Sequence, residues 1–544
     1  ITAMESNHFA KLIVDEQIVR YAEDLVAEFE LASPLLLSHS HIKPIEESNY
    51  LSQVFPLVAK LPLPALRLRF QILHHLNTAL KDVLSCINFG SSGWLSQTVT
   101  KCRGLMFHMV KMTFFYKVLG QTAVKVPQPT VSINRLKLAA VKEKDPPKCL
   151  DDYLKNTCFG ITFHHLKKTP PSHFRQKKPP GAEPHFALKI DFKGENVEGE
   201  GGPYRQFFTD ISRELTHVLP LLIPCPNAIT GTGKNQDKYI TAPSCKSRVH
   251  LEMYKFLGKL MGMAIRTGVM LTIDFPEFFW KPLVGQPLEL ADLSKVDKSL
   301  YGFLEFIKNC EREDLEGPNR KIFEKFQILL SDKTEVLLKP HGDQIDVNWA
   351  NRGEYVDLVI SKRLHEARAQ TNAIREGMNS VVPPMLMKIC TWRDLEWRVC
   401  GKPIIDIKLL KRHTEYSGVL PTAPHIMYFW QTLQSFSQED RRAFVRFAWA
   451  QERLPGSDQE FERTRTRMLI KPFDTSNPDN CFPKADTCFF NLMLPAYSSA
   501  EILRKQFLFA IHTDADSMDA DDPQEEEPLG RPTRTGLSAF LDFR

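Results

Sequence analysis

The sequence lacks several features that would indicate a special environment or partner. Its nearest approach to a membrane-spanning run, residues 218–224, is short and contains two prolines, whereas a spanning helix needs about 20 apolar residues. None of the 11 cysteines belongs to a C-x-x-C pair, which argues against a disulfide framework or a zinc ribbon. The formal net charge of +5 on 544 residues indicates neither a nucleic-acid nor a membrane partner. We therefore expect a protein of the reducing cytoplasm or nucleus, without a membrane span, metal or other cofactor.

The charged residues are unevenly distributed along the chain. A proline-rich stretch, residues 167–178, contains five lysines and arginines. It is either a localisation or ligand patch or, as we expect, a solvated insertion. Residues 513–544 begin with a dense run of aspartates and glutamates, which predicts an acidic disordered tail because such a segment has too little apolar surface to form a core.

The first 130 residues predict an all-helical region. Residues 63–86 carry apolar side chains at spacings of three and four, the period of a helix with one apolar face: Leu66, Phe70, Leu73, Leu76, Leu80 and Leu84. Such a face packs within a helical bundle, which we expect, or forms a groove for a partner. Nine prolines between residues 124 and 184 then predict a loop-rich insertion at about 140–184.

Residues 186–400 alternate between strand-like and helix-like runs, which predicts an α+β unit. Gly201 and Gly202 can adopt positive φ, and Pro203 suits the first position of a helix. The aromatic residues of that helix are expected on one face: Tyr204, Phe207 and Phe208.

Glycines also mark two later helices. Gly258 and Gly262 lie four residues apart, so one helix face can approach a neighbouring helix closely. Gly401 follows the helical run 392–400 and is expected to end it. Beyond this point, the aromatic residues of a smaller unit predict its core: Phe429, Trp430, Phe436, Phe444, Phe447 and Trp449.

Residues 482–492 present one thiol, Cys488, at the start of an apolar strand. A free thiol has a pKa of about 8.5 and is a strong nucleophile near neutral pH, so a cysteine in a loop suits acyl transfer. The alternative is a small buried hydrophobe, the commoner role of a free cysteine. After it, Ser498 and Glu501 are spaced as a capping box, which predicts a closing helix with Leu503, Phe507, Ala510 and Ile511 on one face.

These residues resemble the catalytic-cysteine segment of HECT-type ubiquitin ligases. That segment contains a proline, a short spacer, Thr-Cys-Phe, an aliphatic strand, Leu-Pro-x-Tyr and a closing helix ending in Ala-Ile, and residues 483–511 supply each part in order. Residues 192–208, 256–265 and 347–356 are similar to segments of the large lobe of HECT domains. The similarity runs from about 132 to about 511, and it is strongest toward the large HERC-like members.

The resemblance implies a bilobal α+β fold. A large, mostly helical N-lobe would occupy residues 131–400, preceded by the helical region 1–130. A hinge would lie at Gly401, Lys402 and Pro403, and a small α/β C-lobe at 404–512. In the family the lobes reorient to carry ubiquitin from the conjugating enzyme to the substrate.

The resemblance also implies chemistry for this chain. Cys488 would accept ubiquitin from an E2 conjugating enzyme as a thioester and pass it to lysines of protein substrates. Thr487 could donate a hydrogen bond to the developing oxyanion. Asp486 stands where many members have histidine, and it is either a base for the incoming lysine or a turn residue. Leu541 holds the place of a phenylalanine near the C-terminus, so steps that depend on the tail are in question.

The E2 would dock on an aromatic run that follows Asp297, as the docking helix does in the family. Part of this run can belong to the core instead. The residues assigned to the docking surface are Leu300, Tyr301, Phe303, Leu304, Phe306 and Ile307.

Two other functions compete with the ligase. A cysteine isopeptidase would pair Cys488 with a histidine such as His413, His425 or His512, but no protease signature surrounds the cysteine. A non-catalytic scaffold of the ubiquitin pathway would have kept the fold and lost the activity, against which the intact Thr-Cys-Phe run argues.

Overall fold

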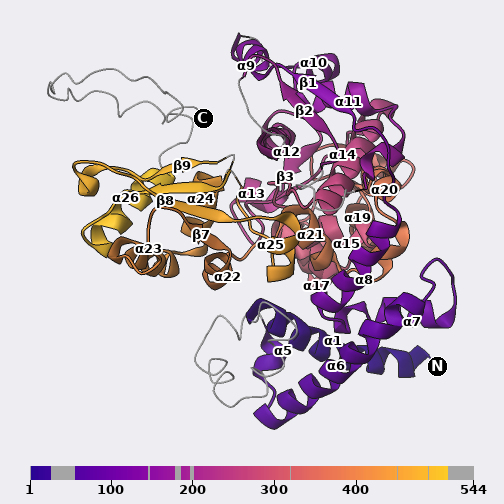
Figure 1. The fold of residues 1–544 in the computed structure, drawn as a ribbon. Helices are drawn as coiled ribbons and strands as arrows, with labels where there is room; N and C mark the ends of the chain where they lie inside the picture. Colours follow the sequence, from indigo (N-terminus) through magenta and orange to yellow (C-terminus); the bar gives the residue numbers. More distant parts are fainter. Residues whose placement is uncertain are drawn as a thin grey trace.

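The computed structural model describes most of the chain, and Figure 1 shows its arrangement. The predicted acidic tail, residues 513–544, and Cys488 lie outside the described residues. Within them, no helix combines the length and apolar character that crossing a membrane requires. The described ranges are 2–25, 55–144, 147–177, 186–195, 201–318, 320–449, 451–487 and 489–512.

The described residues of the N-terminal region are mostly helical up to Gln121. Its elements are α1 (Thr2–Leu25), α5 (Pro56–Ala59), α6 (Leu63–Val83), η2 (Leu84–Cys86), α7 (Trp94–Lys101), η3 (Arg103–Leu105) and α8 (His108–Gln121).

The predicted apolar face of α6 is confirmed with one exception. Leu66, Phe70 and Leu73 are buried, but Leu76 is 38% exposed. Asn77 takes the buried position instead: its side-chain amide donates to the carbonyls of Leu73 and Leu105, and its Oδ1 accepts from a backbone N–H. A buried amide with its hydrogen bonds satisfied is tolerated where an unpaired one is not.

The N-terminal helices share one hydrophobic core with the following unit. A single cluster of buried side chains runs from Phe70 and Phe115 through Phe208 and Leu260 to Val399. We call residues 130–400 the large unit. Because the core is continuous, the helical region is packed onto the large unit rather than forming a bundle of its own.

The large unit begins with β1 and β2, which pair in parallel, and with short helices between them. The prediction that 140–184 is mostly loop is wrong for the described residues. Of the described prolines, Pro147 and Pro170 lie between helices and Pro171 starts η4, and the apolar α11 packs Phe159 and Phe163 against Phe256. The elements are β1 (Thr130–Ile133), α9 (Arg135–Lys144), α10 (Leu150–Lys155), α11 (Cys158–Leu166), η4 (Pro171–Phe174) and β2 (Lys189–Phe192).

Helix α12 (Gly201–His217) buries the predicted aromatic face. Tyr204, Phe207 and Phe208 are fully buried. The helix begins at Gly201, two residues before the predicted start at Pro203. Within this stretch the positive φ belongs to Gly194, at +87°, and not to Gly201 or its neighbour.

The rest of the large unit is mostly helical, with two small antiparallel strand pairs. Its elements are β3 (Leu222–Pro224), α13 (Pro226–Thr230), β4 (Tyr239–Thr241), α14 (Arg248–Thr267), α15 (Glu277–Leu283), α16 (Leu290–Val296), α17 (Lys298–Asn309), α18 (Arg312–Leu315), β5 (Gln327–Leu329), β6 (Glu335–Leu337), η5 (Gly342–Gln344), α19 (Arg352–Leu364), α20 (Arg368–Val381), η6 (Pro384–Lys388) and α21 (Trp392–Cys400).

Helices α14 and α20 pack without room for side chains at their crossing. A Cβ added at Gly258 would lie 1.9 Å from the carbonyl oxygen of Ile374, and one at Gly377 would lie 1.8 Å from that of Lys255. At Gly262 the nearest atom would be 2.7 Å away. The predicted close approach through Gly258 and Gly262 is confirmed, with Gly377 as its counterpart.

Residues 405–512 form what we call the C-terminal unit, which has its own hydrophobic cluster. The mixed sheet has the order β7-β8-β10-β9, in which only β9 is antiparallel. The predicted aromatic core is confirmed, although Phe447 is only partly buried. The elements are α22 (Ile407–Arg412), β7 (Thr414–Tyr416), α23 (Pro424–Ser435), α24 (Gln438–Trp449), α25 (Asp458–Thr464), β8 (Met468–Pro472), η7 (Pro478–Asn480), β9 (Lys484–Asp486), β10 (Asn491–Leu494) and α26 (Ala500–His512).

Helix α26 has a different cap from the one predicted. The Oγ of Ser499 accepts from the amide of Ile502 at 3.3 Å. Ser498 instead bonds Asp479, through both its amide and its hydroxyl. The tertiary partner draws Ser498 away from the helix start, so the cap moves one residue along. The predicted buried face of α26 is confirmed.

Candidate active site

The described neighbours of the predicted nucleophile, Thr487 and Phe489, lie between β9 and β10. These strands pair Asp486 with Asn491, so residues 487–490 form the hairpin connection. The amide of Phe489 donates to the carbonyl of Asp486 at 3.2 Å. Asp486 and Thr487 are half-buried, and the Phe489 side chain is 61% exposed. The residues on both sides of position 488 therefore lie at the surface end of a tight hairpin.

Phe490 anchors this connection to the core. Its φ is +56°, in the left-handed region that few non-glycine residues adopt. Its ring is buried and stacks on Trp449 with centroids 4.8 Å apart and planes 11° apart. Its carbonyl accepts from the amide of Leu469 in β8 at 3.0 Å. The strained backbone is thus held by a hydrogen bond on one side and by an aromatic contact on the other.

Two of the three histidines proposed for an isopeptidase are engaged elsewhere. His413 is buried, its Nε2 lies 2.6 Å from a carboxylate oxygen of Asp458, and its ring stacks on Phe461. It precedes β7, which is two strands away from β10, and adjacent strands lie about 4.8 Å apart. His512 pairs with Asp440 at 2.8 Å. Neither arrangement is that of a base beside the hairpin connection.

The predicted hinge residues are tied on several sides. Gly401 ends α21 with φ +83°, and a Cβ there would lie 2.4 Å from the sulfur of Met270. Lys402 donates its amide to the carbonyl of Leu454 at 3.3 Å. The carbonyl of Gly401 accepts from Arg453 at 3.0 Å. In this conformation the connection between the units is a fixed turn.

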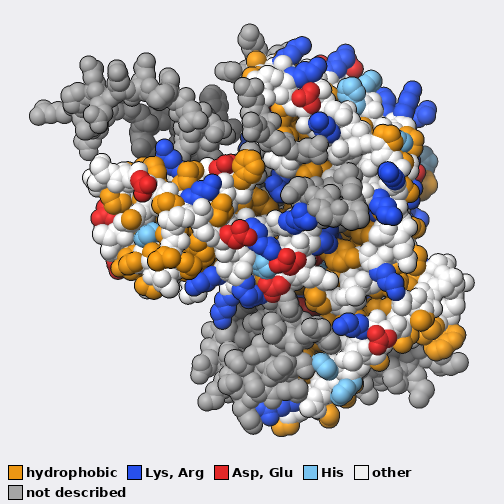
Figure 2. Space-filling view, viewed as in Figure 1, with side chains coloured by type: hydrophobic (Ala, Val, Ile, Leu, Met, Phe, Trp, Pro, Cys, Tyr) orange, Lys and Arg blue, Asp and Glu red, His pale blue; other side chains and the backbone are white. Residues whose placement is uncertain are grey.

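Arg453 is the centre of the contact between the units. It is 6% exposed and pairs with Glu396 at 3.2 Å and with Asp274. Both carboxylates belong to the large unit, whereas Arg453 belongs to the C-terminal unit. Figure 2 shows acidic and basic side chains interspersed over α25, where the two units meet.

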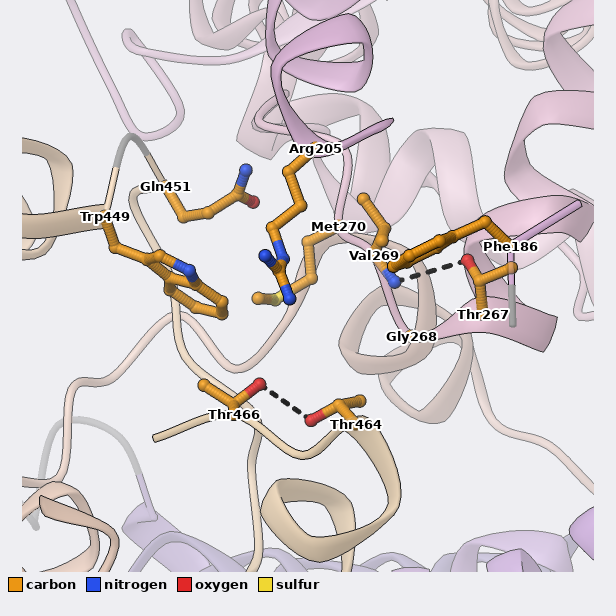
Figure 3. A pocket seen from close by; sticks show the side chains of 10 residues that line it. All are labelled: Phe186, Arg205, Thr267, Gly268, Val269, Met270, Trp449, Gln451, Thr464 and Thr466. Carbon is orange, nitrogen blue, oxygen red and sulfur yellow. Dashed lines mark hydrogen bonds between the residues drawn. The ribbon is translucent and has the colours of Figure 1, made fainter. Parts of the chain in front are cut away.

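A small cavity lies at the same junction (Figure 3). Arg205 and Met270 reach into it from the large unit, and Trp449 and Gln451 face them from the C-terminal unit. Its free volume of about 10 Å³ is of the order that one water needs. Gln451 Nε2 donates to the hydroxyl of Thr209 at 3.2 Å. Trp449 lines this cavity and also stacks on the ring of Phe490.

The residues assigned to E2 docking separate into two groups on α17. Leu304 and Ile307 are buried in a cluster with α19, and Leu300 and Phe303 pack against it. Phe306 is 46% exposed, and Tyr301 is half-buried. Asp297 caps the helix by accepting from the amide of Leu300 at 3.0 Å. Of the six, Phe306 is the exposed side chain, and Tyr301 is half-buried without belonging to the cluster that Leu300 and Phe303 pack against.

The sequence matches the family model described as HECT-domain (ubiquitin-transferase) over residues 209–521, more than half of the chain. The chain belongs to the HECT family. The resemblance read from residues 483–511 is confirmed by this match.

Two long relatives match nearly the whole HECT-family chain. The human E3 ubiquitin-protein ligase HERC2 is 34% identical over 520 residues, which cover 93% of this chain and 10% of that protein. The human probable E3 ubiquitin-protein ligase HECTD4 is 29% identical over 541 residues, covering 92% and 13%. RSP5 of Chaetomium thermophilum is 29% identical over 331 residues, covering 60% and 39%. The chain thus spans about a tenth of the first two relatives.

Sequence reasoning missed the contacts that support the hairpin connection of this HECT chain. The sequence predicts Trp449 as a core residue but not its stack on Phe490. It also gives no signal for the role of Arg453 at the junction between the units. The second phenylalanine after Cys488 was a usable signal, since a large aromatic residue in a short connection must find a buried partner. The partner itself lies 41 residues earlier in the sequence, a pairing that no local pattern indicates.

Proposed function

We propose that the chain is the catalytic part of a HECT-type E3 ubiquitin-protein ligase. Family membership and the surface position of residues 487 and 489, on either side of Cys488, support this assignment. The partners are an E2 conjugating enzyme, ubiquitin and protein substrates, and the site of action is the cytoplasm or nucleus. The observation that carries the proposal is the Thr-Cys-Phe run in the β9–β10 connection of a chain that matches the family.

The reaction consists of two acyl transfers. The Cys488 thiolate attacks the carbonyl carbon of the E2–ubiquitin thioester, and the E2 thiolate leaves. A substrate lysine amine then attacks the new thioester, forms an isopeptide bond, loses a proton and expels the Cys488 thiolate. The first step exchanges one thioester for another, so catalysis consists mainly of positioning. Thr487 is assigned to the oxyanion and Asp486 to the proton of the lysine.

The separation between the main cluster of the large unit and the cluster of the C-terminal unit supports a bilobal assignment. We assign residues 131–400 to the N-lobe, 401–403 to the hinge and 404–512 to the C-lobe. The junction between them is lined by charged groups such as Arg453 and Asp274, which favours separable units over a continuous core. Reorientation about Gly401 would bring Cys488 in turn to the E2 and to the substrate.

For E2 docking we propose the exposed side of α17. Phe306 and Tyr301 would contact the E2, because exposed aromatic residues contribute strongly to binding. Leu304 and Ile307 would instead hold the helix in place from beneath. Phe306→Ser should therefore weaken E2 binding without unfolding the protein, whereas Ile307→Ser should destabilise it.

The test of the proposed function uses the thiol itself. Incubation with activating enzyme, an E2 and ubiquitin should give an adduct that reducing agent removes, because thiols cleave thioesters but not isopeptide bonds. Cys488→Ala should abolish both the adduct and ligase activity. Cys481→Ala is the matched control, since this partly buried cysteine lies seven residues earlier. The exposed Cys86 and Cys149 test whether accessibility alone suffices.

A full-rate reducible adduct on Cys488→Ala would falsify the assignment. So would a wild-type protein that forms no adduct with any of a panel of E2 enzymes. Cleavage of ubiquitin chains by the purified protein would instead favour the isopeptidase.

A further inference from the structure

Glu460 joins three parts of the molecule. It lies on α25 in the C-terminal unit and is 4% exposed. Its Oε1 accepts from Arg398 of α21 at 2.7 Å and from the hydroxyl of Tyr116 of α8 at 3.2 Å. The Nε2 of His108, also on α8, lies 3.8 Å away. One buried carboxylate thus binds the C-terminal unit to the large unit and to the N-terminal helical region.

A second buried carboxylate continues the network. Asp394 of α21 bonds the Nδ1 of His108 at 2.7 Å and the Nζ of Lys111 at 2.5 Å. Burial opposes a charged imidazole, but the hydrogen bond to Asp394 and the nearby carboxylate of Glu460 outweigh it and raise the pKa of His108 to about 9. His108 is therefore a cation between two carboxylates at neutral pH.

The N-terminal helices also hold the hinge. The Nζ of Lys402 donates to the carbonyl of Glu23 on α1 at 2.8 Å. The same ammonium group lies 5.0 Å from the centre of the Trp397 ring, which contacts the His108 ring. Arg463 of α25 lies over the ring of Tyr116 at 4.8 Å. Both the hinge and α25 are therefore fastened to α1 and α8.

Water can take the place of the protein partners in these charged contacts. Charged groups can replace a buried partner with water if the units separate, whereas a continuous apolar interface offers no such substitute. Truncating one partner while the units stay together leaves a buried charge uncompensated. The network thus favours one orientation of the C-terminal unit without making it permanent.

We propose that α1 and α8 brace the C-terminal unit in this orientation, with Glu460 as the positioning residue, and so set the balance between loading of Cys488 and its discharge. The inference rests on the proposed function, because it concerns the two transfers of that mechanism. It extends that function by giving the N-terminal helical region a part in the reaction. In this proposal Glu460 acts through the orientation of the C-terminal unit.

The test measures orientation and chemistry separately in the full chain. Fluorescent labels introduced through noncanonical residues at the exposed positions Ile229 and Met427 report the distance between the units. Glu460→Gln removes the charge, and Tyr116→Phe removes only the hydroxyl. Glu462→Gln is the matched control, because Glu462 lies on the same helix with its side chain 65% exposed, and its partners, Arg467 and the more distant His413 at 3.9 Å, both belong to the C-terminal unit.

Both brace variants should broaden the distance distribution and change the ratio of loading rate to discharge rate at least threefold. Tyr116→Phe should do so less than Glu460→Gln, and Glu462→Gln should leave both readouts unchanged. Tyr116→Phe keeps the test valid if Glu460→Gln folds poorly. An unchanged distribution and an unchanged rate ratio in folded Tyr116→Phe and Glu460→Gln would overturn the brace.

Failure of the proposed function would look different. A wild type that forms no ubiquitin adduct would refute the ligase while the distance distributions could still be compared. If those distributions do not respond to the variants, the brace is refuted whatever the chemistry proves to be.

Discussion

The crossing of α14 and α20 and the junction at α25 hold the molecule together in opposite ways. At the crossing, Gly258 and Gly377 let two backbones touch, and no charged side chain separates them. At the junction, Glu460 and Arg453 meet buried partners of opposite charge. The first contact exists in one arrangement only, because an ångström of displacement loses the packing. The contact at the junction consists of charged groups that can form hydrogen bonds with water instead of with each other.

This difference separates a rigid platform from an adjustable joint. The platform is the core of the large unit around α14 and α20, and the joint lies between that core and the C-terminal unit, which carries the hairpin connection. The two contacts should therefore respond differently to substitution.

The largest effect is expected at the crossing. Gly258→Ala places a methyl group 1.9 Å from a carbonyl oxygen in a site with backbone on both sides, so it should cost at least about 3 kcal/mol of unfolding free energy or prevent folding. Gly302→Ala in α17 is the control, because nothing lies within 4 Å of its added Cβ. Thermal denaturation should show a large drop for the first and a small rise for the second. Equal stability of the two variants would contradict the rigid crossing.

Breaking the junction should cost nearly as much. Arg398→Met leaves Glu460 buried without its closest cation, and removal of one member of a buried pair costs about 3–5 kcal/mol. Urea denaturation should show this loss. Arg467→Met, which breaks a surface pair with Glu462, should change stability by less than about 1 kcal/mol. A junction variant as mild as the surface variant would show that water already replaces the buried partner.

The junction should also depend on pH through His108. Its pKa is about 9 in the folded protein and about 6.5 when unfolded, so the folded state binds the proton more tightly. The stabilisation, about 3 kcal/mol by linkage, is complete below about pH 6.5 and is lost as the pH rises through 9. His108→Gln should flatten this part of the stability profile measured by denaturation at each pH. An unchanged slope in the variant would assign the dependence to another group.

The smallest effect is expected beside the proposed nucleophile. Phe490→Leu removes the stack on Trp449 and keeps the backbone conformation, so it should cost about 1 kcal/mol. Phe489→Leu, one residue earlier and exposed, should change stability by less than about 0.5 kcal/mol. Chemical denaturation distinguishes the two. If Phe489→Leu proved the costlier, the assignment of Phe490 as the anchor would be wrong.

Periodic and steric signals in the sequence predicted the rigid part of the fold well. The aromatic face of α12 and the close approach at Gly258 follow from side-chain size and helical period alone. Prediction failed where tertiary partners changed a local preference. Asn77 displaced Leu76 from a buried position, and Asp479 drew Ser498 from the helix cap. Pro147 and Pro170 mark gaps between helices rather than an absence of helices.

The candidate site was predictable only in its local part. The Thr-Cys-Phe motif locates residues 487–489, because catalytic motifs are short and contiguous. Glu460 and Tyr116 are 344 residues apart, and nothing in either neighbourhood of the sequence indicates the other. Networks that set orientation are therefore visible only once the chain is folded.

The start of α12 also bears on how the protein can be divided. The family match begins at residue 209, within a helix that runs from Gly201 to His217. A fragment cut there would lose Tyr204 and Phe207, both fully buried, and would expose the surfaces against which they pack. It would also lose Tyr116. Recombinant fragments intended to retain native behaviour should therefore start before α1, because the boundary of family similarity is not the boundary of the folding unit.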